Sequence, residues 1–105
     1  MPKKQKKKQR YIKVVDERFT LSKKHGGGAI KIEAWEDHKG AVVKYNIAYI
    51  NHHLCQKDNG RVIGYDNAHD YHHKHYFGEI FPVEDFESYE NLVERFENEI
   101  KEYIK

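Results

Sequence analysis

The apolar residues of this chain change their spacing once, and that change limits the folds open to it. Between residues 29 and 36, Ile30, Ile32 and Ala34 occupy every second position. From residue 89 onward, apolar side chains such as Leu92 and Phe96 recur at steps of three and four. The first period is typical of a half-buried strand and the second of an amphipathic helix. The order predicts an α+β domain, in which a sheet is completed before one C-terminal helix covers it.

The sheet is predicted to be an antiparallel β-meander of about five strands. The KDNG run at residues 57–60 marks a hairpin, because Asn-Gly accepts the positive φ angles of tight turns. In the first strand, Ile12, Val14 and Val15 are the expected core residues, and Pro82 is expected to close the sheet. The predicted strands cover residues 11–20, 29–36, 41–54, 61–67 and 75–81.

The helix is predicted by one continuous apolar stripe near the end of the chain. Ser88 has the side chain of an N-cap, and acidic residues gather where the helix dipole is positive. The stripe consists of Tyr89, Leu92, Val93, Phe96, Ile100, Tyr103 and Ile104.

Charge is distributed unevenly along the chain. Residues 1–10 carry six cations and no anion, whereas residues 82–105 carry a net charge of −5. A block of like charges buries nothing, so we predict a disordered basic tail at residues 1–10 and a single domain at residues 11–105. The tail is either a solubilising segment or a nonspecific attachment to phosphates.

Cys55 is the single cysteine of the sequence, so no internal disulfide can form. The sequence also lacks the apolar run of a secretory signal or of a membrane span. These features predict a cytoplasmic protein.

Histidines are concentrated in one short run. Four of the eight lie within residues 69–75, inside the sequence YDNAHDYHHKH at residues 65–75. Histidine exchanges protons near neutral pH and is the commonest metal ligand. This run is therefore the best candidate for a functional site.

Strand alternation predicts that His73 and His75 share one face of the sheet, while His72 and Lys74 point to the other. Two imidazoles beside a carboxylate could cleave RNA without a metal, with one ring removing the 2′-hydroxyl proton and the other protonating the leaving oxygen. We predict His73 and His75 as the proton-transfer pair. The expected supporting residues are His69 and Asp66 for orienting or replacing one ring, and Arg61, Lys74, Tyr71 and Tyr65 for binding RNA.

Three other interpretations of the histidine run stay open. One is a metal site, although the Cys and His spacings of known zinc motifs and the HExxH motif are missing, so we assign no metal ligands and expect no cofactor. Another is recognition of RNA or of an acidic protein without catalysis. The last is a surface turn that is rich in histidine for no chemical reason.

Residues 60–104 resemble the TumE family of toxins from prokaryotic type II toxin–antitoxin pairs. The resemblance lies in YDNAH at residues 65–69, in HKH at residues 73–75 with Gly78 soon after, and in a closing helix behind the acidic linker at residues 84–87. The lysine-rich tail departs from the family pattern, and so does Asp70, where a glycine would be more usual.

The resemblance implies a small cytoplasmic toxin that acts on RNA or translation and is held inactive by a cognate antitoxin. A ribonuclease mechanism is the expectation that joins this resemblance to the histidine run. No membrane is expected as a partner, and a small homo-oligomer is compatible with the sequence. The alternative is a non-enzymatic, histidine-rich module that binds nucleic acid or metal.

Overall fold

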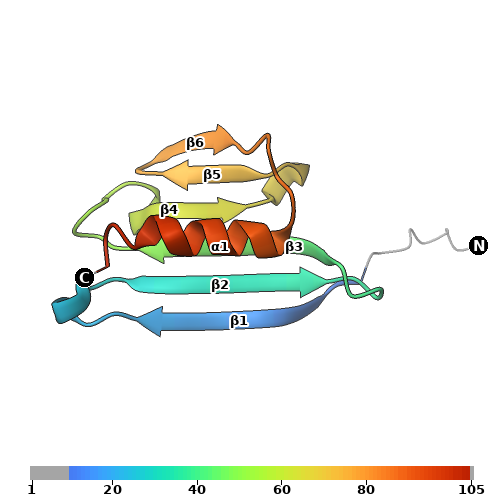
Figure 1. The fold of residues 1–105 in the computed structure, drawn as a ribbon, viewed down its shortest axis with the longest axis horizontal. Coiled ribbons are helices and arrows are strands. Elements are labelled where there is room, and N and C mark those ends of the chain that lie inside the picture. Colours follow the sequence, from blue (N-terminus) through green and yellow to red (C-terminus); the bar gives the residue numbers. More distant parts are fainter. Residues whose placement is uncertain (1–9, 105) are drawn as a thin grey trace, which may run out of the picture.

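A computed structural model describes residues 10–104, which form one antiparallel sheet and one long helix (Figure 1). The six strands follow each other in the sheet in chain order, so the predicted β-meander and the α+β class are confirmed. Of the predicted basic tail, only Arg10 lies within the described residues. The elements are β1 (Ile12–Thr20), β2 (Ala29–Glu36), β3 (Val42–Ile50), β4 (Arg61–Asp66), β5 (His73–Tyr76), β6 (Glu79–Pro82) and α1 (Tyr89–Ile100), with short 3-10 turns at Lys23–His25, Asp58–Gly60 and Ala68–Asp70.

The predicted number of strands was one too low, because the segment 75–81 contains a hairpin. Phe77 and Gly78 have φ angles of 47° and 86° and form the turn between β5 and β6. Phenylalanine is not a typical turn residue, but here its ring packs edge-on against Tyr103 at the core. Tertiary packing therefore holds Phe77 in a backbone conformation that its residue type does not suggest.

The predicted strand 41–54 was too long at its C-terminal end. β3 stops at Ile50, and His52 and His53 lie in the turn that follows. A turn is present where residues 57–60 were predicted to form one, since Asp58, Asn59 and Gly60 all have positive φ angles. It ends the longer connection at residues 51–60 between the paired strands β3 and β4, so it is not the tight hairpin turn that was predicted.

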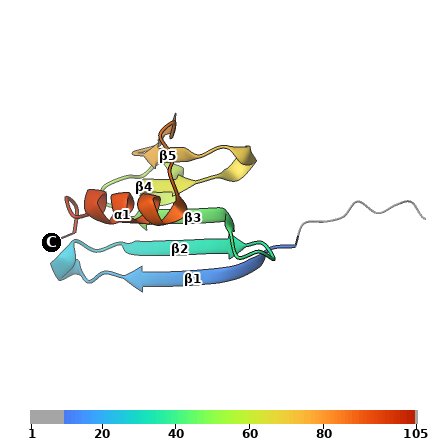
Figure 2. The same ribbon diagram turned by 45° about the vertical axis from the view of Figure 1, so that its right-hand side comes forward.

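Helix α1 packs across β3 and β4 and encloses the core between itself and the sheet (Figures 1 and 2). The predicted N-cap is confirmed, because the Ser88 hydroxyl accepts a 3.0 Å hydrogen bond from the Asn91 amide. The largest fully buried side chains are Tyr49, Tyr65, Phe96, Ile47, Leu92 and Val62.

Strand β1 lies at the edge of the sheet, beyond the strands that the helix packs on. Ile12 and Val14 were predicted as core residues, but they are 65% and 46% exposed. Val15 is half-buried. The sequence located this strand correctly, but its local pattern carried no information on how far helix α1 reaches.

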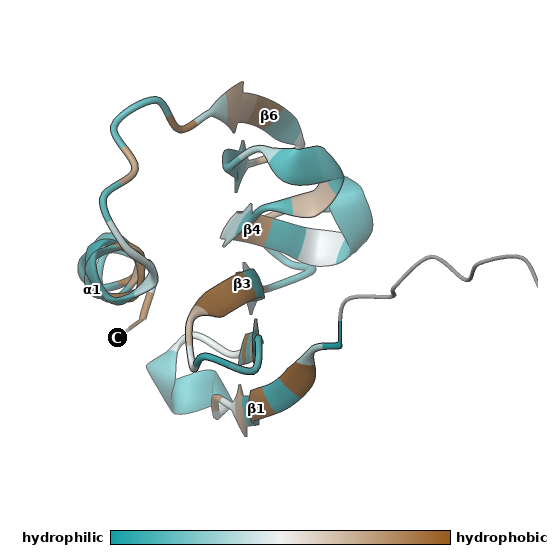
Figure 3. Ribbon diagram, turned by 90° about the vertical axis from the view of Figure 1, so that its right-hand side faces the viewer, coloured by the Kyte–Doolittle hydropathy of each residue, from teal (hydrophilic) through white to brown (hydrophobic). Residues whose placement is uncertain are grey.

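The opposite face of the sheet is open. Figure 3 looks along the strands and shows α1 on one side of the sheet, with no element of residues 10–104 layered over the other side. Within the same residues, no helix combines the length and the apolar character needed to cross a membrane. Side chains on the open face can therefore contact other molecules wherever neighbouring side chains do not cover them.

Candidate functional site

Strand register brings the predicted site residues together on the open face. Asp66 on β4 pairs with His73 on β5, and Gly64 pairs with His75. Between them, Tyr65 and Lys74 point the other way, because both contact Glu99 of α1. Alternation therefore places Asp66, His73 and His75 on the face opposite the helix. The predicted sharing of one face by His73 and His75 is confirmed.

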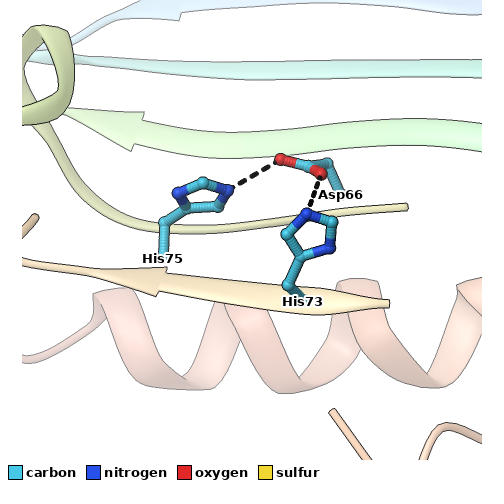
Figure 4. Close-up of side chains that lie close together, drawn as sticks. All are labelled: Asp66, His73 and His75. Carbon is cyan, nitrogen blue, oxygen red and sulfur yellow. Dashed lines mark hydrogen bonds and ion pairs between the residues drawn. The ribbon is translucent and has the colours of Figure 1, made fainter. Parts of the chain in front are cut away.

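The Asp66 carboxylate joins the two imidazole rings (Figure 4). Its Oδ2 atom lies 2.9 Å from Nε2 of His75, and its Oδ1 atom lies 3.4 Å from Nε2 of His73. The ring centroids are 5.7 Å apart. We refer to these three residues as the Asp–His–His cluster.

The second nitrogen of each ring also has a partner. Nδ1 of His73 lies 2.8 Å from the carbonyl oxygen of Tyr71. A carbonyl only accepts, so Nδ1 carries a proton, and in the neutral ring the lone pair is on Nε2. Nδ1 of His75 lies 3.1 Å from the Asp58 carboxylate, so both nitrogens of this ring face acidic groups. Both contacts are hydrogen bonds only when the His75 ring carries two protons.

Arg61 connects the acidic groups around the cluster. Its guanidinium contacts Asp58 at 3.1 Å and Asp66 at 3.3 Å. The Arg61 stem lies over Gly64, where an added Cβ atom would come within 2.7 Å of Cδ of Arg61. Glycine at position 64 thus leaves room for Arg61 to lie along the sheet and reach Asp66.

The electrostatics of the cluster favour an ionised Asp66 beside a neutral His73. Burial raises the pKa of the Asp66 carboxyl, but hydrogen bonds from His75 and from the Ala68 amide outweigh it and lower the pKa to about 2. Burial lowers the pKa of His73, against the opposing effect of Asp66.

The cluster is less open than the sequence led us to expect. His73 and His75 are only 5% and 6% exposed. The cover is local, because the half-exposed ring of Tyr71 stacks on His73 with the centroids 4.2 Å apart. The rings are thus shielded by side chains of the open face and not by the helix.

A shallow depression of about 480 Å³ lies next to this cover. Tyr71 lines it and also stacks on His73, so the depression and the cluster share one side chain. Lys44, His69 and His72 contribute the positive or protonatable basic groups of its wall. The predicted residues His69 and Tyr71 therefore lie beside the cluster.

Two predicted RNA-binding residues lie on the wrong face for this site. Lys74 forms a 2.9 Å ion pair with Glu99 of α1. Tyr65 is fully buried, and burial together with its hydrogen bond to Glu99 raises the pKa of its hydroxyl. Lys74 lies between His73 and His75, and Tyr65 directly precedes Asp66, so strand alternation turns both side chains to the helix face.

The structure adds Asp58 and Gly64, which sequence reasoning did not single out. Asp58 belongs to the predicted hairpin turn, and its carboxylate reaches His75 only because β4 and β5 pair in this register. The signal for Gly64 was its position in a strand, where glycine often marks a close approach of other atoms.

The cluster also has the composition of a metal site. One nitrogen from each ring and one carboxylate oxygen all lie within 4.8 Å of one another. A set of two histidines and one carboxylate is known from sites for divalent transition metals.

Comparison with known proteins supplies the family. No curated protein and no solved structure matches the chain. A family model described as Toxin TumE matches residues 5–104, which includes every residue of the cluster. Since the match covers nearly the whole sequence, the chain belongs to the TumE toxin family.

Proposed function

We propose that this protein is the toxin of a toxin–antitoxin pair and that it acts by cleaving RNA at the Asp–His–His cluster. Membership of a toxin family supports the first part. The observation that carries the second part is the meeting of two imidazoles and a carboxylate on an open sheet face.

The hydrogen bonds of the cluster assign different tasks to the two rings. His73 is held by the Tyr71 carbonyl with its lone pair on Nε2, which suits a base that removes the 2′-hydroxyl proton. His75 lies between the carboxylates of Asp58 and Asp66, and each can accept a hydrogen bond from one ring nitrogen of a protonated imidazole. That form suits an acid that protonates the leaving 5′-oxygen. Asp66 orients both rings.

RNA would approach through the depression beside the cluster. Tyr71 and His69 line it, and the exposed Tyr71 ring can stack on an unpaired base. To reach Nε2 of His73, the substrate has to displace the Tyr71 ring. Arg61 is the cation nearest to the cluster, and a phosphate there would compete with Asp58 and Asp66 for its guanidinium.

The direct test is cleavage of labelled RNA by the purified protein in the presence of EDTA. We expect cleavage by the wild-type protein and none by the His73→Gln/His75→Gln double variant. His53→Ala is the matched control, because this exposed histidine lies in the turn after β3. Full activity of the double variant would overturn the proposal.

The alternative is a protein that binds nucleic acid without cleaving it. The low exposure of His73 and His75 is the observation that favours it. In the same assay such a protein would retard the RNA on a gel and leave it intact.

In cells, expression of the wild-type protein should stop growth, and co-expression of its antitoxin should restore it. The double variant should permit growth at the same protein level. A variant that still arrests growth would place the toxic activity outside the cluster.

A further inference from the structure

The strongest unassigned feature of the molecule is the direction of the histidine nitrogens in the cluster. Nε2 of His75 and Nε2 of His73 both point at the Asp66 carboxylate, at 2.9 Å and 3.4 Å. One nitrogen from each ring and one carboxylate oxygen lie within 4.8 Å of one another. Three such atoms are the ligand set of many divalent metal sites.

The distances suit a small metal ion. Zinc bound by histidine nitrogen or carboxylate oxygen has bonds of about 2.0–2.2 Å, which separates neighbouring ligands by roughly 3.3 Å in a tetrahedron. The nitrogen–oxygen distances of 2.9 Å and 3.4 Å lie on either side of that value, although they go to different oxygens of the Asp66 carboxylate. The three ligand atoms as a set lie within 4.8 Å of one another, so side-chain shifts of about an ångström would complete the geometry.

The Nδ1 atoms of His73 and His75 have the surroundings that are usual in histidine ligands of metals. Such a histidine usually donates its other N–H to a carbonyl or a carboxylate, which fixes the tautomer and aims the lone pair at the metal. His73 does this through Nδ1 with the Tyr71 carbonyl, and His75 can do so through Nδ1 with Asp58. Asp58 is itself held by Arg61. In both rings, the Nδ1 atom therefore has the kind of partner that metal-binding histidines use.

We propose that the cluster binds one divalent transition metal of the zinc class, through Nε2 of His73, Nε2 of His75 and the carboxylate of Asp66. Three protein ligands leave a coordination position for water or for a substrate oxygen. The proposal goes beyond RNA cleavage and does not depend on it. The two are connected, because a metal would occupy the nitrogens that transfer protons in the proposed reaction. Metal binding should therefore inhibit metal-independent cleavage.

The binding test uses the full-length protein after removal of metals with a chelator. Co²⁺ is titrated in while its visible absorption is recorded, and Zn²⁺ is then added to displace it. We expect one Co²⁺ per chain with the intense visible bands of a four- or five-coordinate ion. The Asp66→Asn and His73→Ala/His75→Ala variants should lose the signal.

Adventitious binding by other histidines is the main competing explanation. His38→Ala/His53→Ala removes the same number of histidines from two exposed turn positions and should bind like the wild type. Asp58, the partner of Nδ1 of His75, allows an intermediate test. Asp58→Asn should weaken metal binding by roughly 10–100-fold without removing a ligand. Equal binding by all these variants, or no binding by the wild type, would overturn the proposal.

Loss of folding is separated from loss of a ligand by the melting temperature of each metal-free variant. Zn²⁺ should raise the melting temperature of the wild type, because it binds the folded state. It should not raise that of a folded Asp66→Asn variant. A rise of equal size in this variant would contradict the assigned ligands.

RNA cleavage measured in EDTA and in Zn²⁺ distinguishes the two proposals. Cleavage in EDTA that Zn²⁺ inhibits supports both. Metal binding without cleavage under either condition overturns the proposed ribonuclease and supports the metal site. Cleavage that requires a metal supports the metal site and overturns proton transfer by His73 and His75.

Discussion

The two faces of the β4–β5 pair use neighbouring residues for opposite purposes. On the helix side, Tyr65 and Lys74 contact Glu99 and help to hold α1 on the sheet. On the open side, Asp66 and His73 form a polar cluster, and the ring of Tyr71 stacks on His73. A shift of one position in the strand separates a stabilising residue from a candidate functional one.

The adjacent histidines show the difference most clearly. His72 stacks on Phe86 with ring centroids 3.5 Å apart, and its Nδ1 lies 2.6 Å from the Tyr45 hydroxyl. His73, the next residue, faces Asp66. Residue type alone therefore says little about role within this run, and the strand position decides it.

The largest expected effect is on the open face. His73→Gln/His75→Gln should lower the rate of RNA cleavage by about 10²–10⁴-fold, the usual contribution of general acid–base groups. His72→Gln should leave the rate within a few-fold of wild type. The single-turnover rate on labelled RNA measures both.

The free energy of unfolding should respond in the opposite way, with the larger loss in His72→Gln. His72→Gln loses its aromatic stacking, so we expect a loss of about 1–2 kcal/mol in the free energy of unfolding by urea. Loss of cleavage in His72→Gln without destabilisation would remove the distinction between the two faces.

The second prediction concerns the space beneath Arg61. In the Gly64→Ala variant, the new Cβ atom would lie 2.7 Å from Cδ of Arg61 and 2.8 Å from the carbonyl oxygen of Ile47. Overpacking of this kind costs about 1–3 kcal/mol. Arg61 should be pushed away from Asp66, so RNA cleavage and metal affinity should fall together with the melting temperature.

Gly40→Ala is the comparison for this variant. Gly40 has a φ angle of 83°, but an added Cβ atom would meet no atom within 4 Å. It should cost roughly 1 kcal/mol through backbone strain alone. Cleavage and metal binding at a temperature where the protein is folded should not change. A Gly64→Ala variant that behaves like Gly40→Ala would mean that Arg61 does not depend on Gly64.

Much of the scaffold could be predicted from local signals. The apolar period predicted the helix and most strands, Asn59-Gly60 predicted the turn before β4, and Ser88 predicted the start of the helix. Alternation also separated His73 from His72. These features depend on residues close together in the sequence, whose geometry is set by the backbone itself.

The rest depends on contacts between distant residues. The turn at Phe77 follows from its packing on Tyr103, and the exposure of Ile12 follows from the reach of α1. Asp58 joins the site only through the pairing of β4 with β5. The sequence offered no metal motif because the three candidate ligands come from two strands, with no spacing that a motif search would recognise.

The third prediction tests the helix side at the partly buried hydrogen bond between Tyr65 and Glu99. The Tyr65 hydroxyl donates a 2.7 Å hydrogen bond to the Glu99 carboxylate. Tyr65→Phe removes the donor and should cost about 1.5–3 kcal/mol, the range for hydrogen bonds to charged groups. RNA cleavage should stay at the wild-type rate, because the ring points away from the cluster. Reduced cleavage at unchanged stability would restore Tyr65 as an RNA-binding residue.

The smallest effect is expected at Lys74, the residue that the sequence placed in the site and the fold places against the helix. Its ion pair with Glu99 is partly exposed, with each side chain 27% accessible to solvent, so Lys74→Gln should cost at most about 1 kcal/mol. Part of this cost should disappear at high salt, since screening weakens such pairs. Cleavage and metal affinity should not change, whereas Arg61→Gln, on the open face, should reduce both. Equal losses of cleavage in the two variants would show that RNA reaches both faces of the strand pair. The assignment of a stabilising role to the helix face and a functional role to the open face would then be wrong.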